Sequence, residues 1–195
     1  SGIIFYRKHL EDAINNAVFP ALQGGPHNHQ IGALAVALRE AASPSFKEYI
    51  CAVKGNARTL AAELMRRGYS ICTGGTDNHL VLWDLRPQKL TGSKMEKLCE
   101  AVHISLNKNA IVGDKSAAVP GGVRLGTPAM TTRGLGESDF EEVAELLHQA
   151  VQIALRLQEA SGPKLAAFAG LMEGDAEVEA LRERVQSFSQ GFYMP

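Results

Sequence analysis

Segments with helical periodicity alternate along this chain with short apolar runs, and that alternation limits the fold most strongly. A Ser-Pro pair at 43–44 predicts the N-cap and first turn of a long helix, which an Arg-Arg-Gly run at 66–68 ends. Residues 69–72 and 79–85 follow as strands. The nearly continuous apolar run of the second strand predicts an interior place in a sheet. Strands that alternate with helices predict an α/β layered fold.

The rest of the chain continues this alternation. Helical spacing predicts further helices over residues 9–18, 31–38, 95–102 and 178–188. Ser138 and Glu141 have the spacing of a capping box and predict the start of a helix that Gly162 and Pro163 end. Further strands are predicted at residues 1–7, 104–106 and 123–125.

Charge and cysteine usage exclude several classes of function. The formal net charge is -1 without a basic stripe, which argues against a nucleic-acid partner. No apolar run approaches the roughly 20 residues that span a bilayer, which argues against a membrane protein. Cys51, Cys72 and Cys99 form no CxxC pair, so we expect buried thiols in a reducing intracellular compartment. The chain opens without Met or a leader, as a piece of a longer protein would. We predict the cytoplasm, with mitochondrion or plastid as alternatives.

A glycine- and histidine-rich loop at 23–29 is the first candidate site. Gly24 and Gly25 would let backbone N–H groups approach an anion closely, as a phosphate requires. The alternative is an ordinary glycine turn that feeds a helix. His27 and His29 have no third ligand at a recognisable spacing, so we expect no metal site.

Arg124 is the second candidate, because it lies in the otherwise apolar run Gly-Gly-Val-Arg-Leu-Gly-Thr-Pro. Its planar guanidinium matches a carboxylate with two hydrogen bonds, which lysine cannot do. The alternative is a structural ion pair with an aspartate or glutamate. From the residues alone, both interpretations stay open.

Two polar segments complete the candidates. Asparagines at 107 and 109, followed by the run 113–118, offer donors and acceptors that can bind a heterocyclic amide, or they form a solvated loop. The segment 74–79, Gly-Gly-Thr-Asp-Asn-His, reads as a turn that sets the entry to the next strand. No nucleophile–base pair and no Walker lysine is visible.

Four strings together resemble serine hydroxymethyltransferase, a pyridoxal-phosphate enzyme. They occupy residues 19–29, 74–79, 107–109 and 124–129, in order along essentially the whole chain. The resemblance implies a pyridoxal-phosphate-dependent transferase of fold type I, similar to aspartate aminotransferase. Residues 1–45 would be the C-terminal end of the large cofactor-binding domain, and residues 46–195 the small α/β domain.

The implied activity interconverts serine and glycine and transfers a one-carbon unit to tetrahydrofolate. By the same resemblance, Arg124 would bind the carboxylate of the amino acid. Gly24 and Gly25 would contact the phosphate of the cofactor held by a neighbouring subunit, which implies a homo-oligomer, dimer or tetramer.

The resemblance also implies a folate pocket. Asn109 would line it, together with the backbone of Ser116, Ala117 and Ala118. Arg133 matches a second arginine on the substrate or folate side.

The family's Schiff-base lysine lies in a Thr-rich stretch that ends in His-Lys, and these 195 residues contain no such stretch. Lys8, Lys108 and Lys115 are not in that context, so none of the residues here is assigned a catalytic role. We therefore expect this fragment alone to be inactive. Two alternatives remain, a non-catalytic module that binds folate or an amino acid or that dimerises, and another fold-type-I pyridoxal-phosphate enzyme.

Overall fold

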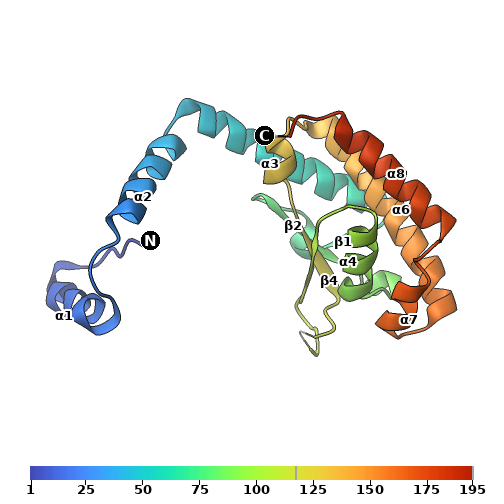
Figure 1. The fold of residues 1–195 in the computed structure, drawn as a ribbon, viewed down its shortest axis with the longest axis horizontal. Coiled ribbons are helices and arrows are strands. Elements are labelled where there is room, and N and C mark those ends of the chain that lie inside the picture. The colour runs from blue at the N-terminus through green and yellow to red at the C-terminus, as the bar shows by residue number, and fades with distance from the viewer. Residues whose placement is uncertain (117, 195) are drawn as a thin grey trace. The chain divides into compact units, whose positions relative to one another are not determined.

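The computed structural model describes residues 1–116 and 118–194. The chain divides into two compact units, Ser1–Glu48 and Tyr49–Pro195, and Figure 1 colours them along the sequence. The first unit is helical, whereas the second contains the sheet and the hydrophobic core.

The first unit contains a 3-10 turn η1 (Lys8–Leu10), helix α1 (Glu11–Asn16), a π-helical segment η2 (Ala17–Leu22) and helix α2 (Asn28–Ala41). The helices predicted over 9–18 and 31–38 are confirmed. The strand predicted at 1–7 is wrong, because those residues are irregular. A strand needs a hydrogen-bonding partner, and residues 1–48 contain no strand to pair with.

Helix α3 (Pro44–Arg66) begins and ends as its sequence predicts. The N–H of Phe46 donates to Ser43 Oγ at 3.2 Å, which makes Ser43 the N-cap. At the other end Gly68 has a φ of 85°, and the N–H of Tyr69 donates to the Leu64 carbonyl at 3.1 Å. This is the glycine-capped helix end described by Schellman.

The second unit is built on a four-stranded antiparallel sheet in the order β1-β2-β4-β3. The strands are β1 (Ser70–Ile71), β2 (Leu80–Asp84), β3 (Asn107–Asn109) and β4 (Gly122–Gly126). The interior place of β2 is confirmed. The strand predicted at 104–106 begins three residues later, because the N–H of Ile104 still caps the preceding helix by donating to the Cys99 carbonyl at 2.8 Å.

In the described part of the second unit, five further helices and two short 3-10 turns accompany α3 and the sheet (Figure 1). They are η3 (Cys72–Gly74), η4 (Arg86–Gln88), α4 (Gly92–Ala101), α5 (Pro128–Thr132), α6 (Glu137–Ser161), α7 (Leu165–Gly170) and α8 (Ala176–Gln190). The predicted capping box at Ser138 is misplaced, since the Asp139 carboxylate accepts from the Gly136 N–H at 2.8 Å. The N-cap of α6 is therefore Gly136.

The two faces of the sheet differ sharply. Val81 and Trp83 on β2, and Val123 and Leu125 on β4, are buried in a core that also contains side chains of α3, α4, α6 and α8. Residues in between point to the other face, where Arg124 is exposed. Among the described residues, no helix combines the length and the apolar character needed to cross a membrane.

The cysteines do not all follow the expectation of buried thiols. Cys51 is exposed, Cys72 is half-buried and only Cys99 is fully buried. Burial raises the pKa of the Cys99 thiol far above its usual range, which keeps that thiol protonated and unreactive.

Candidate functional site

Arg124 lies in the middle of the open face of the sheet. Its Cα is in register with that of Leu82 on β2 and that of Asn107 on β3, so the three side chains share one face. Asn109, in register with Gly122, lies on the same face two pairs further along. The residues predicted to bind a carboxylate and a folate are thus brought to a single surface.

A cavity of about 410 Å³ opens beside Arg124. Its lining contains polar and apolar side chains but no acidic one: His79, Leu80, Ser105, Leu106, Asn107, Arg124, Leu125 and Gly126. Within residues 1–116 and 118–194, Arg124 makes no ion pair and no side-chain hydrogen bond. The alternative of a structural ion pair therefore finds no partner in the described chain, and the guanidinium is available to an anion.

The predicted folate residues lie at the edge strand and in the loop that follows it. Asn109 donates from Nδ2 to the Ala110 carbonyl at 2.6 Å and is half-buried. Ser116 and Ala118 are exposed, and the N–H of Ala118 donates to Ser116 Oγ at 3.1 Å. Ala117 lies outside the described residues.

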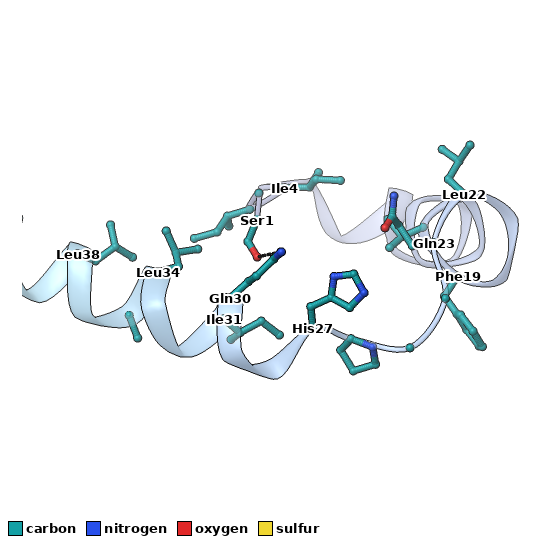
Figure 2. A pocket seen from close by; sticks show the side chains of 17 residues that line it. Ser1, Ile4, Phe19, Leu22, Gln23, His27, Gln30, Ile31, Leu34 and Leu38 are labelled. Carbon is teal, nitrogen blue, oxygen red and sulfur yellow. Dashed lines mark hydrogen bonds between the residues drawn. The ribbon is translucent and has the colours of Figure 1, made fainter.

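Gly24 and Gly25 lie in the loop that leads into α2, beside a cavity of about 970 Å³ (Figure 2). Neither glycine has a positive φ, so backbone conformation does not explain the choice of glycine. A Cβ built at either position would meet no atom within 4 Å, so the backbone there is open to an approaching group. Such an open backbone before a helix N-terminus fits a phosphate.

Two further motifs have structural contacts. The Arg133 guanidinium donates to the carbonyls of Ser189 at 2.7 Å, Phe192 at 3.2 Å and Tyr193 at 3.1 Å, so it fastens the C-terminal segment. Its place on the substrate or folate side stays a prediction. In the 74–79 segment, Thr76 Oγ1 donates to the Leu80 carbonyl, and Asn78 Oδ1 accepts from the Leu80 N–H. This confirms a turn that sets the entry to β2.

Sequence reasoning included Asp114 in the polar run 113–118 without assigning it a role of its own, and it missed Arg86. Arg86 follows β2, and its guanidinium reaches Asp114 across the loop, with 3.8 Å between Nη1 and Oδ1. For Asp114 the sequence offered a local signal of a turn, because this residue directly follows Gly113. No local pattern indicated that Arg86 would meet it.

Comparison with known proteins places this chain in a family. The family model described as serine hydroxymethyltransferase matches residues 4–147. The chain belongs to the serine hydroxymethyltransferase family. Pyridoxal phosphate, serine, glycine and tetrahydrofolate are the cofactor and substrates of this family, and its members are transferases of fold type I. The mixed α/β structure, mostly helical with a small antiparallel sheet, agrees with that class.

Individual relatives from plants and animals match the whole chain. It is 52% identical over 210 residues to serine hydroxymethyltransferase 4 from Arabidopsis thaliana, of which it covers 45%. It is 48% identical over 206 residues to the chloroplastic serine hydroxymethyltransferase 3 from the same plant, covering 39%. It is 46% identical over 216 residues to the cytosolic enzyme of Oryctolagus cuniculus, covering 45%. The chain thus spans less than half the length of these relatives.

Proposed function

We propose that this chain is the C-terminal part of a serine hydroxymethyltransferase that interconverts serine and glycine and transfers a one-carbon unit to tetrahydrofolate. The observation that carries the proposal is Arg124, an exposed arginine without an ion pair in the described chain, beside a cavity whose lining contains no acidic residue. A carboxylate would neutralise Arg124 there without competing with a protein carboxylate. Residues 1–45 would complete the large domain, and residues 46–195 would form the small domain.

The chain's own residues would hold and orient the ligands. Arg124 would bind the carboxylate of the amino acid and fix its orientation. Asn109, with the backbone of residues 116–118, would hold the folate. The open backbone of Gly24 and Gly25 would bind the phosphate of pyridoxal phosphate from a neighbouring subunit, which requires at least a dimer. The cofactor, when bound, supplies an electron sink for the substrate's α-carbon.

The 195 residues by themselves would be inactive. They contain no His-Lys pair, so the lysine that would hold the cofactor covalently is not among them. One relative is named as cytosolic and another as chloroplastic, and we propose the cytoplasm for the protein of this chain, with mitochondrion or plastid as alternatives.

The proposal is tested with the full-length enzyme loaded with pyridoxal phosphate. We expect glycine to form from serine only when tetrahydrofolate is present, measured by amino-acid analysis. The 195-residue chain serves as the matched sample. It should form no glycine and no borohydride-trapped adduct of pyridoxal phosphate at a single lysine. A full-length enzyme that forms no glycine would refute the assignment, whereas a stoichiometric adduct in the short chain would refute its predicted inactivity.

A further inference from the structure

The loop 110–121, which carries the predicted folate residues 116–118, is closed at its base by charged side chains. Asp84 ends β2, and its carboxylate accepts hydrogen bonds from the Arg86 guanidinium, at 3.0 Å and 3.3 Å from Nε and at 2.8 Å from Nη2. This pair orients the Arg86 fork toward the loop. Nη1 then donates to the Val112 carbonyl at 3.1 Å and lies 3.8 Å from Asp114 Oδ1.

Asp114 joins the two ends of the same loop. Its Oδ2 accepts from the N–H of Ile111 at 2.9 Å and from the N–H of Gly121 at 2.8 Å. These backbone donors lower the pKa of the Asp114 carboxyl, with Gly121 the stronger contributor, so the carboxylate stays ionised at neutral pH. The side chains of Asp114 and Arg86 pack closely against the backbone of Gly121. A Cβ at Gly121 would lie 2.7 Å from Asp114 Oδ1 and 2.8 Å from Arg86 Cγ.

The described side chains between these contacts are largely exposed to solvent. Val112 is 97% exposed and Val119 is 61% exposed, and Ser116 and Ala118 are exposed as well. Because these side chains bury little apolar surface, the order of this part of the loop depends on its base, where Asp114 and Arg86 make their polar contacts and Ile111 is buried.

We propose that Arg86 and Asp114 are positioning residues for the folate ligand. They hold the described part of the loop in the conformation in which Ser116 and Ala118 meet the ligand, and they do not touch the ligand themselves. This inference rests on the proposed function. A ligand that binds a disordered loop must order it at binding, whereas a loop closed at its base is already ordered and binds more tightly.

The test uses the full-length enzyme with pyridoxal phosphate and the substitutions Arg86→Gln and Asp114→Asn. The dissociation constant of tetrahydrofolate in the presence of glycine should rise about tenfold, as expected for the loss of one net hydrogen bond. The dissociation constant of glycine alone should change less than about twofold, because glycine would bind at Arg124. Both constants are measured by isothermal titration calorimetry.

A matched control is available on α6. Arg156 pairs with Asp175 at 2.7 Å and is 43% exposed, close to the 44% of Arg86, but it does not contact the loop. Arg156→Gln should leave both dissociation constants unchanged. Cleavage by trypsin after Lys115 gives a second readout, independent of ligand. It should become several-fold faster in the Arg86 and Asp114 variants than in the parent or the control.

Each outcome decides the inference. Unchanged folate binding in both variants overturns it, and so does an equal weakening of glycine and folate, which would show a general structural role. Weaker folate binding without faster cleavage at Lys115 would show that the two residues act by another route, and it also overturns loop positioning. If the parent enzyme binds no tetrahydrofolate, the proposed function itself fails. If instead the parent binds tetrahydrofolate and the variants bind it equally well, only the positioning role fails.

Discussion

At the scale of single residues, Arg124 differs from most arginines of the second unit. Arg66, Arg67, Arg86 and Arg156 pair with carboxylates, whereas Arg124 pairs with none in the described chain. Arg124 is exposed, and no contact with a described side chain explains its place on β4 between the buried Val123 and Leu125. A ligand carboxylate explains its presence better than stability does.

If Arg124 binds the substrate carboxylate, Arg124→Lys should weaken serine binding in the full-length enzyme. Lysine keeps the charge but loses one arm of the two-armed carboxylate contact, so the KM for serine should rise about 30-fold, which corresponds to roughly 2 kcal/mol. Steady-state kinetics at saturating tetrahydrofolate measure it. Arg58→Lys on α3 is the control, because Arg58 is exposed and also makes no ion pair in the described residues. A serine KM within twofold of the parent for Arg124→Lys would show that another group binds the carboxylate.

Residue-level predictions from the sequence succeeded where the interaction is local. Ser43 caps α3 and Gly68 ends it. Each of these helix ends depends on hydrogen bonds between residues within two helical turns of one another. The sequence left Arg124 undecided between a ligand and an ion pair, because the answer depends on which side chains the fold brings beside it. For the same reason the contact between Arg86 and Asp114 could not be foreseen.

At the scale of elements, α4 approaches the sheet closely at Gly92. The N–H of Gly92, the first residue of α4, donates to the Pro120 carbonyl at 2.8 Å. A Cβ at Gly92 would clash with the Gly122 carbonyl oxygen and lie 3.1 Å from that of Pro120. Because both obstacles are backbone atoms, neither can move aside cheaply.

Gly92→Ala should therefore destabilise the chain by about 1–3 kcal/mol, the usual cost of overpacking. Urea unfolding followed by fluorescence measures this, since Trp83 is the only tryptophan and is fully buried. The matched control is Gly170→Ala in α7, where a Cβ would meet nothing within 4 Å. That substitution should change the free energy of unfolding by less than about 1 kcal/mol. Equal effects of the two substitutions would contradict the packing argument.

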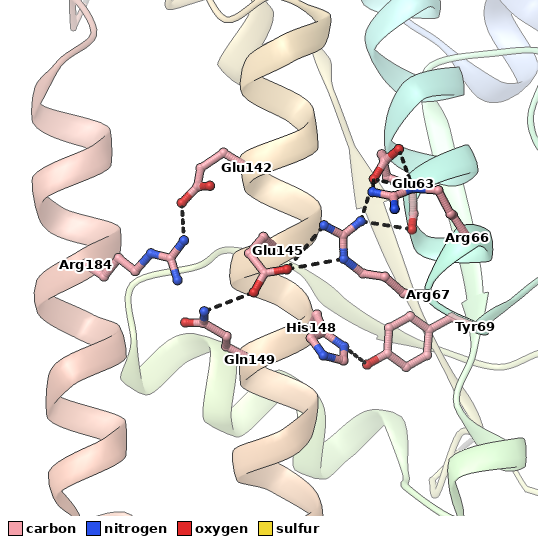
Figure 3. Close-up of polar contacts among 9 residues, drawn as sticks. All are labelled: Glu63, Arg66, Arg67, Tyr69, Glu142, Glu145, His148, Gln149 and Arg184. Atoms are coloured by element: carbon pink, nitrogen blue, oxygen red, sulfur yellow. Dashed lines mark hydrogen bonds and ion pairs between the residues drawn. The ribbon is translucent and has the colours of Figure 1, made fainter.

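An ion-pair network ties α3 to α6 (Figure 3). Glu63 pairs with Arg66 at 2.5 Å and with Arg67 at 2.6 Å, and Arg67 also reaches Glu145 at 3.2 Å. Hydrogen bonds from Arg66 first, and then from Arg67, lower the pKa of Glu63 from 4.5 to about 2. The unfolded chain therefore binds a proton at Glu63 more readily than the folded chain does.

The sign of the pH effect follows from this lowered pKa. The stabilisation from Glu63 is fully present above its ordinary pKa of 4.5 and is lost as the pH falls toward about 2. We expect Glu63→Gln to reduce the fall in unfolding free energy between about pH 5 and about pH 3. Urea unfolding at both pH values measures it. Glu142→Gln, which removes the exposed pair with Arg184 shown in Figure 3, should reduce the fall less. A larger effect of Glu142→Gln would contradict the assignment.

At the scale of elements, the sequence predicted long helices well and strands less well. The amphipathic stripes of α3, α6 and α8 identified these helices, because a helix makes its hydrogen bonds within itself. The extended run at residues 1–7 failed as a strand, because strand pairing depends on a partner elsewhere. The short helices α5 and α7, of five and six residues, give too few repeats for a periodic signal.

At the scale of the whole molecule, the two units differ in how much they bury. No residue of 1–48 is buried, although this unit is rich in apolar side chains. Phe5, for example, is 91% exposed and Leu22 is 79% exposed. The second unit buries a continuous core that includes Trp83, Phe140 and Phe168. Amphipathic helices gain most of their stability from packing, so the helices of the first unit lack their main stabilising interaction in this chain.

This difference predicts the pattern of amide hydrogen exchange. In the 195-residue chain, amides of α2 should exchange at least ~100-fold faster than those of α6, because only the α6 amides need cooperative unfolding of a core to open. Mass spectrometry of peptic fragments resolves the two helices. Amides of the exposed helix α1 serve as an internal comparison and should exchange like those of α2.

The same measurement on the full-length enzyme separates two explanations for the exposed apolar side chains. If residues 1–45 complete a large cofactor-binding domain, the remainder of that domain covers Leu22, Ile31 and Leu38, and α2 becomes protected by a factor similar to that of α6. If α2 is already as protected from exchange as α6 in the short chain, the first unit is stable by itself. Rapid exchange of α2 in the full-length enzyme would show that these residues do not belong to a packed domain, and the domain assignment would fail with it.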